Sequence, residues 1–262
     1  MELLLHILAG ATVGFAIGLT GVGGGSLMTP LLLVFGYSPP IAIGTDLLYA
    51  AITKAGGAVS HHRRANVSWP IVARLAAGSI PVSIVLHWLF LDSSFQQSPS
   101  FESILTTSLG VMLITTAIIL FFRDKLRKSA IEEKPRAIMQ TIHNNRPLVT
   151  WMMGLLLGVC VTLSSVGAGA FGAAILLTIY SSTPAARIIG TDIAHAVPLT
   201  FIAGLGYLFA GFVDMTLLIS LLIGSLPAIS LGSRVSSQVP ERLLQRILTL
   251  ILLTLGMYYS FS

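Results

Sequence analysis

Two short glycine-rich stretches in this 262-residue chain combine backbone freedom with hydroxyl side chains. Glycine lets a backbone turn and approach a ligand closely, and the exposed N–H groups of a helix that begins after such a joint suit an anion. Alternatively, the glycines only permit tight helix packing. Because each joint precedes a short apolar segment, we favour an anion-binding site. Its expected residues are Thr20, Gly21, Gly23, Gly24, Gly25, Ser26, Ser164, Ser165, Gly167 and Gly169.

A Gly-Thr-Asp triplet follows each joint, at residues 44–46 and 190–192. Asp46 and Asp192 lie inside apolar segments, where a carboxylate costs about 2.5–3.5 kcal/mol, so each needs a partner or a role. Each could accept hydrogen bonds from the backbone at the neighbouring joint, or carry a proton. Direct substrate contact is disfavoured because a free carboxylate repels an anion. The predicted coupling or supporting residues are Thr45, Asp46, Thr191, Asp192 and His195.

Two single residues near these triplets carry alternatives. Lys54 lies well inside an apolar segment, where it could attract the anion as part of the substrate site or extend its ammonium group to the membrane surface. His195 lies one turn from Asp192 and is either a proton relay or a packed neutral histidine. No third ligand accompanies His61 and His62, so we expect no metal site and no cofactor. No motif of a membrane-embedded protease occurs, which argues against an enzyme.

The composition places the chain in a lipid bilayer. Hydrophobic residues make up 54% of the sequence and charged residues only 10%, too apolar for a soluble domain. The net charge of +5 does not indicate nucleic acid, because Lys and Arg of membrane proteins collect in cytoplasmic loops. A single cysteine, Cys160, excludes an intrachain disulfide.

Ten apolar segments, several of them long enough for a membrane span, predict an all-α polytopic membrane protein. They cover residues 3–20, 26–37, 41–60, 67–91, 101–122, 148–163, 171–181, 186–210, 214–233 and 243–260. Residues 123–147 hold seven basic residues and three acids and predict a cytoplasmic linker. This linker divides the chain into an N-terminal membrane repeat, residues 1–122, and a C-terminal one, residues 148–262.

The two halves align at a constant offset of 146 residues. Besides the triplets, Gly78-Ser79-x-Pro81 aligns with Gly224-Ser225-x-Pro227, which indicates an internal repeat. Every basic residue can be placed at or near the cytoplasmic face, and the basic loop at 61–64 aligns with uncharged residues 207–210. The repeats are therefore predicted to be inverted, with about five membrane segments each, including short broken or hairpin segments. Both termini are then periplasmic.

These features resemble the TauE/SafE family of sulfite exporters and related permeases. The resemblance rests on GVGGG at 21–25, Ile43-Gly44-Thr45-Asp46 and its echo Ile189-Gly190-Thr191-Asp192, and it spans nearly the whole chain. It implies transport, commonly export, of sulfite or a related small sulfur-containing anion across the bacterial inner membrane. An organosulfonate or sulfoacetate permease and an anion channel are the alternatives. The expected partners are that anion and the lipid bilayer, with a homo-oligomer left open.

Overall fold

The computed structural model describes residues 2–20, 27–90, 96, 98–132, 145–235 and 241–261, which form ten helices and no strand. The prediction of an all-α protein is confirmed in these ranges, and each helix overlaps one predicted apolar segment. The helices are α1 (Glu2–Thr20), α2 (Met28–Val34), α3 (Pro39–Arg63), α4 (Trp69–Phe90), α6 (Pro99–Glu132), α8 (Arg146–Ser164), α9 (Ala170–Ile179), α10 (Ala185–Phe209), α11 (Met215–Val235) and α12 (Glu241–Phe261).

Five of the described helices, α4, α6, α8, α10 and α11, are long and apolar enough to cross a membrane. The apolar parts of α1 and α12 are shorter, at Leu3–Leu19 and Thr249–Tyr259. Large apolar side chains also point outward: Trp88 is 75% exposed, Phe121 73% and Phe209 79%. An apolar outer surface on this scale requires a lipid environment, so the chain is a multi-pass membrane protein.

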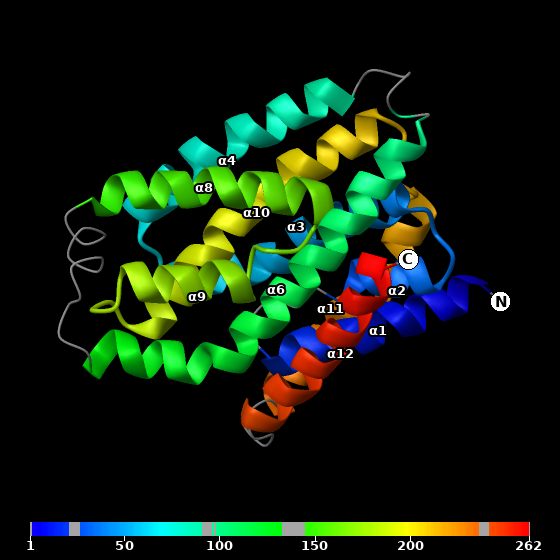
Figure 1. The fold of residues 1–262 in the computed structure, drawn as a ribbon. Helices are drawn as coiled ribbons and strands as arrows, with labels where there is room; N and C mark the ends of the chain where they lie inside the picture. The colour runs from blue at the N-terminus through cyan, green and yellow to red at the C-terminus, as the bar shows by residue number, and fades with distance from the viewer. Residues whose placement is uncertain are drawn as a thin grey trace.

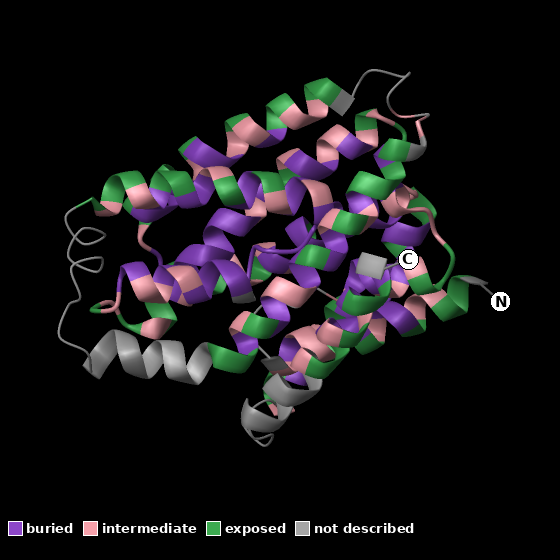
Figure 2. Cartoon of the chain, viewed as in Figure 1, coloured by how far each residue is buried: buried purple, intermediate pink, exposed green. Residues whose placement is uncertain are grey.

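The centre of the molecule is formed by α3 and α10, which pack on one another and carry long stretches of buried residues. Figure 2 shows these buried stretches beneath outer helices whose outward faces are exposed. Around the centre, α1 pairs with α11, α4 with α8, and α6 with α12. The polar residues of the two triplets therefore lie in the protein interior.

Glycines allow two of the outer helix pairs to approach closely. A methyl group at Gly14 of α1 would collide with the backbone of Ser225 on α11. Likewise, a methyl group at Gly78 of α4 would collide with the backbone of α8, and one at Gly154 of α8 with Leu75. Small residues at such crossings increase the packing contact between helices in lipid, where the hydrophobic effect does not drive them together.

The ends of the helices are divided between two sides of the molecule. In Figure 1, α1 begins and α4 ends on the right, whereas α6 ends and α8 begins on the left. The predicted linker begins as helix, because α6 continues to Glu132, and α8 begins at Arg146. Residues 133–144 of the linker lie outside the described residues.

Candidate functional site

The second glycine-rich joint connects α8 to α9 through a turn that needs left-handed backbone conformations. Ser165 has a φ of 58°, and Gly167 and Gly169 have φ values of 126° and 132°. Glycine adopts such angles without a steric penalty, which explains its presence at 167 and 169. Ser164 and Ser165 are buried, at 0% and 1% exposure. The chain therefore breaks between two helices inside the protein, as predicted.

The first joint cannot be compared with the second one. Gly21, Gly23, Gly24, Gly25 and Ser26 lie outside the described residues, and so does the side chain of Thr20. Their role in binding an anion stays a prediction. The description of the site therefore rests on the second joint and on the helices α2, α3 and α10.

Lys54 connects α3 of the first half to the joint of the second half. Its side chain is 6% exposed, and its Nζ donates a hydrogen bond of 3.0 Å to the carbonyl oxygen of Ala168. The ammonium group is therefore held inside the protein, and the alternative that it extends to the membrane surface is wrong. A buried cation is thus attached to the broken backbone between α8 and α9.

Asp46 holds the start of the short helix α2. Its Oδ2 accepts hydrogen bonds from the Thr29 hydroxyl at 2.5 Å and from the Thr29 backbone N–H at 3.2 Å. Thr29 is the second residue of α2, where backbone N–H groups have no partner within the helix. Asp46 thus accepts from backbone next to the first joint, one of the two predicted roles.

Asp192 faces the start of the other short helix, α9, with fewer partners. The Gly169 backbone N–H points toward its carboxylate, and a methyl group at Gly172 would collide with its Oδ1. Among the described residues, this Oδ1 has no hydrogen-bond donor. Asp192 is 1% exposed. Lys54 interacts electrostatically with both Asp192 and Asp46, so one basic side chain is within electrostatic range of two buried carboxyl groups.

His195 is completely buried one turn beyond Asp192 on α10. Its Nε2 forms a hydrogen bond of 2.8 Å with the Ser79 hydroxyl, whose direction depends on the tautomer. This contact favours neither the relay nor the packed neutral histidine. Ser79 was not predicted as a site residue, although the repeated Gly-Ser-x-Pro motif that contains it was a visible signal. No group of three potential metal ligands is found among the described residues.

Thr45 and Thr191 of the triplets bind the loops of the opposite halves. The Ser68 backbone N–H donates to Thr191 Oγ1 at 2.9 Å, and the Asp214 backbone N–H donates to Thr45 Oγ1 at 3.3 Å. These two bonds correspond at the 146-residue offset, since Thr45 matches Thr191 and Ser68 matches Asp214. The structure thus assigns both threonines a loop-holding contact.

The glycines of the triplets form a second pair of matching contacts. A methyl group at Gly44 would collide with the carbonyl oxygen of Phe212, and one at Gly190 with the carbonyl oxygen of Asn66. Asn66 and Phe212 again differ by 146 residues. The Gly-Thr part of each triplet therefore packs against the loop that follows the central helix of the other half.

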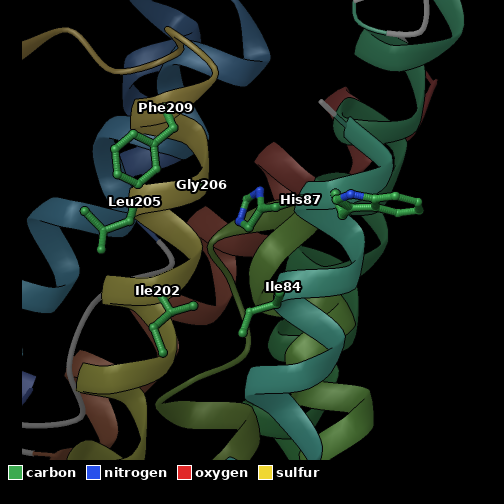
Figure 3. A pocket seen from close by; sticks show the side chains of 7 residues that line it. Ile84, His87, Ile202, Leu205, Gly206 and Phe209 are labelled. Atoms are coloured by element: carbon green, nitrogen blue, oxygen red, sulfur yellow. The ribbon is translucent and has the colours of Figure 1, made fainter. Parts of the chain in front are cut away.

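A cavity of about 360 Å³ lies between α4 and α10. Figure 3 shows Ile84 and His87 of α4 pointing toward α10, whose Ile202, Leu205 and Phe209 also line the cavity. The lining is almost entirely apolar, and its His87 ring packs edge-on against Tyr207. An apolar cavity without a fixed positive charge does not suit a small anion, so it is separate from the candidate site at Lys54.

Buried charges at a broken helix between membrane-spanning helices define a class, the polytopic membrane transporters. The sequence model of the sulfite exporter TauE/SafE family matches residues 6–259, so the chain belongs to this family.

Curated relatives agree with this assignment. "Probable membrane transporter protein YjnA" of Bacillus subtilis is 40% identical over 256 residues, covering 96% of this chain and 97% of the relative. "Probable membrane transporter protein YdhB" of the same organism is 25% identical and covers 92% and 94%. "Probable membrane transporter protein MJ0441" of Methanocaldococcus jannaschii is also 25% identical and covers 97% and 94%. No solved structure matches significantly. The chain is a membrane transporter.

Proposed function

We propose that the chain is a secondary transporter that exports sulfite, or a related small sulfur-containing anion, across the inner membrane by alternating access. The observation that carries this proposal is the buried Lys54 ammonium group at the carbonyl of Ala168. A charged side chain at this depth is expensive, so intramembrane cations usually mark substrate or ion pathways. The proposal that the anion contains sulfur comes from the name of the family.

The anion is proposed to bind beside Lys54 at the second joint. Lys54 would supply the positive charge, and the buried Ser165 hydroxyl, whose Oγ has no hydrogen-bond partner among the described residues, would supply a donor. The backbone N–H groups and flanking hydroxyls of residues 20–26 are proposed to complete the site from the other half. A compact anion suits a site bounded by backbone and small side chains.

Alternating access is proposed to arise from two inverted repeats, residues 1–122 and 148–262, with the basic linker in the cytoplasm and both termini outside. The matching contacts of Thr45 and Thr191, and of Gly44 and Gly190, support a two-fold relation between the halves. The swap of basic residues between equivalent loops supports opposite orientations. Exchange of conformation between such repeats would open the site to one side and then to the other.

Flux through the purified protein tests this proposal. Proteoliposomes loaded with unlabelled sulfite should accumulate radiolabelled sulfite by counterflow, with saturation, whereas protein-free vesicles should not. Thiosulfate, sulfate and sulfoacetate, tested as competitors, define the preferred anion. Conductance that does not saturate would instead indicate an anion channel. Failure to move any of the four anions would refute the sulfur-anion assignment.

A further inference from the structure

We propose that Asp192 carries a proton together with the transported anion, whereas Asp46 remains ionised and holds helix α2 in place. This inference rests on the proposed function and assigns its coupling ion. It begins from a difference between two aspartates that occupy equivalent positions in the two repeats.

The two carboxyl groups differ in their hydrogen-bond donors. Asp46 Oδ2 accepts from both the hydroxyl and the backbone N–H of Thr29, which stabilise its charged form. Asp192 has no hydroxyl donor among the described residues and receives only the Gly169 backbone N–H. The Oδ1 atoms of both aspartates are without a partner there, so the difference lies in the Thr29 hydroxyl. Position 175, which corresponds to Thr29 in the other half, is Ile175. The loss of this hydroxyl leaves Asp192 as the carboxyl group that is easier to protonate.

The charges around Lys54 give protonation a function. With both aspartates ionised, the centre holds two negative charges and one positive charge, and it repels an arriving anion. A proton on Asp192 leaves Asp46 and Lys54 as a balanced pair, so the repulsion falls and the anion can approach Lys54. The proton and the anion therefore bind together and leave together on the other side, where Asp192 is ionised again. Export would then require an outward substrate gradient larger than the inward proton gradient that opposes it.

The titratable side chains that interact electrostatically in this centre are Lys54, Asp46, Asp192 and His195. Among the helices packed against α10, α3 contributes Lys54 and Asp46, and α9 contains no titratable side chain. The part of α4 near His195 contributes the neutral Ser79. On α8, the Arg146 guanidinium group lies over the ring of Tyr180, 5.5 Å from its centroid. With His195 neutral, the charge of the centre is therefore set by Lys54 and the two aspartates.

Asp192→Asn tests the proposal because asparagine resembles the protonated acid but cannot release a proton. Proteoliposomes with the membrane potential clamped at zero are given a gradient of about one pH unit, acidic outside, which drives about tenfold accumulation per coupled proton. Sulfite and thiosulfate uptake are each corrected for protein-free vesicles. Wild type should approach this accumulation, whereas Asp192→Asn should still show counterflow but no accumulation. Asp46→Asn is the matched control, and its remaining uptake should still respond to the gradient.

Two results would overturn the assignment: equal pH-driven accumulation by Asp192→Asn and wild type, or loss of coupling in Asp46→Asn alone. A second measurement needs no transport. In substrate-free protein, a buried carboxyl C=O infrared band should titrate in wild type and Asp46→Asn but be missing from Asp192→Asn. If wild type moves no sulfur anion but shows this band, the proposed function fails and the protonation of Asp192 stands. A band that persists in Asp192→Asn refutes the protonation.

Discussion

The Lys54 ammonium group can be tested by substitution with an apolar side chain of similar length. Lys54→Met removes the cation and its bond to the Ala168 carbonyl. Because a hydrogen bond to a charged group contributes about 1.5–3 kcal/mol, we expect the ratio kcat/KM for anion flux to fall about tenfold to hundredfold. Counterflow in proteoliposomes measures this ratio.

A matched control for Lys54→Met is Arg74→Met on α4, which removes a basic side chain that is exposed. Its flux should stay near that of wild type. If both variants lose flux equally, the positive charge acts over the whole molecule and not at the second joint. Wild-type flux in Lys54→Met would remove Lys54 from the substrate site.

Gly172 gives a second test at the scale of a single residue. A methyl group there would collide with Asp192 Oδ1, so Gly172→Ala must displace either α9 or the carboxylate. Such overpacking costs about 1–3 kcal/mol, and the melting temperature in detergent should fall. Gly56→Ala on α3 is the matched control, because no atom lies within 4 Å of the added methyl group. Gly56→Ala should melt at or above the wild-type temperature, since alanine is the better helix former. An unchanged Gly172→Ala would contradict this contact.

At the scale of helices and loops, the hydroxyl groups of Thr45 and Thr191 hold the two loops that follow α10 and α3. Thr191→Val removes the acceptor of the Ser68 N–H, and Thr45→Val removes that of the Asp214 N–H. Each bond contributes about 1 kcal/mol. Amide exchange followed by mass spectrometry should therefore speed up about fivefold around Ser68 in Thr191→Val and around Asp214 in Thr45→Val. If amide exchange sped up at both loops in both variants, the substitutions would have destabilised the whole protein, and the separate loop contacts would be contradicted.

Most helices could be predicted from the sequence because long apolar runs separated by glycine or polar residues are nearly sufficient to define membrane segments. The C-terminal end of α6 could not be predicted in this way. Hydropathy stops at residue 122, but the helix continues to Glu132, since Lys, Arg and Glu are good helix formers in water. The contacts between the two halves could not be predicted from the hydropathy pattern either. Lys54 and Ala168 are 114 residues apart, and the sequence marked both regions as functional without showing that they meet.

The partner of Asp46 shows the same limit. A buried carboxylate that needs donors follows from the apolar segment around it, and donors at the neighbouring joint were one prediction. Thr29 itself carries no sequence signal, because a threonine in a short apolar segment is ordinary. Its role depends on how α2 packs against α3, which only the three-dimensional arrangement provides.

At the scale of the whole molecule, inverted repeats require equivalent turns to face opposite sides of the membrane. The turns after α3 and α10 match in backbone conformation, since Ala65 and Gly211 both have positive φ, at 55° and 80°. Basic residues surround the first turn and are missing from the second. Because Lys and Arg remain in the cytoplasm, the turn at Ala65 should be inside and the turn at 210–214 outside.

Single cysteines measure this sidedness directly. In a Cys160→Ser background, which removes the natural cysteine, Ala65→Cys should react with a membrane-impermeant thiol reagent only in inside-out vesicles. Ala210→Cys, in the matching turn, should react only in right-side-out vesicles. Reaction of both from the same side would refute the inverted arrangement. In that case the matching Thr45 and Thr191 contacts would relate two repeats of the same orientation in the membrane. Alternating access by exchange of conformation between inverted halves would then have to be abandoned.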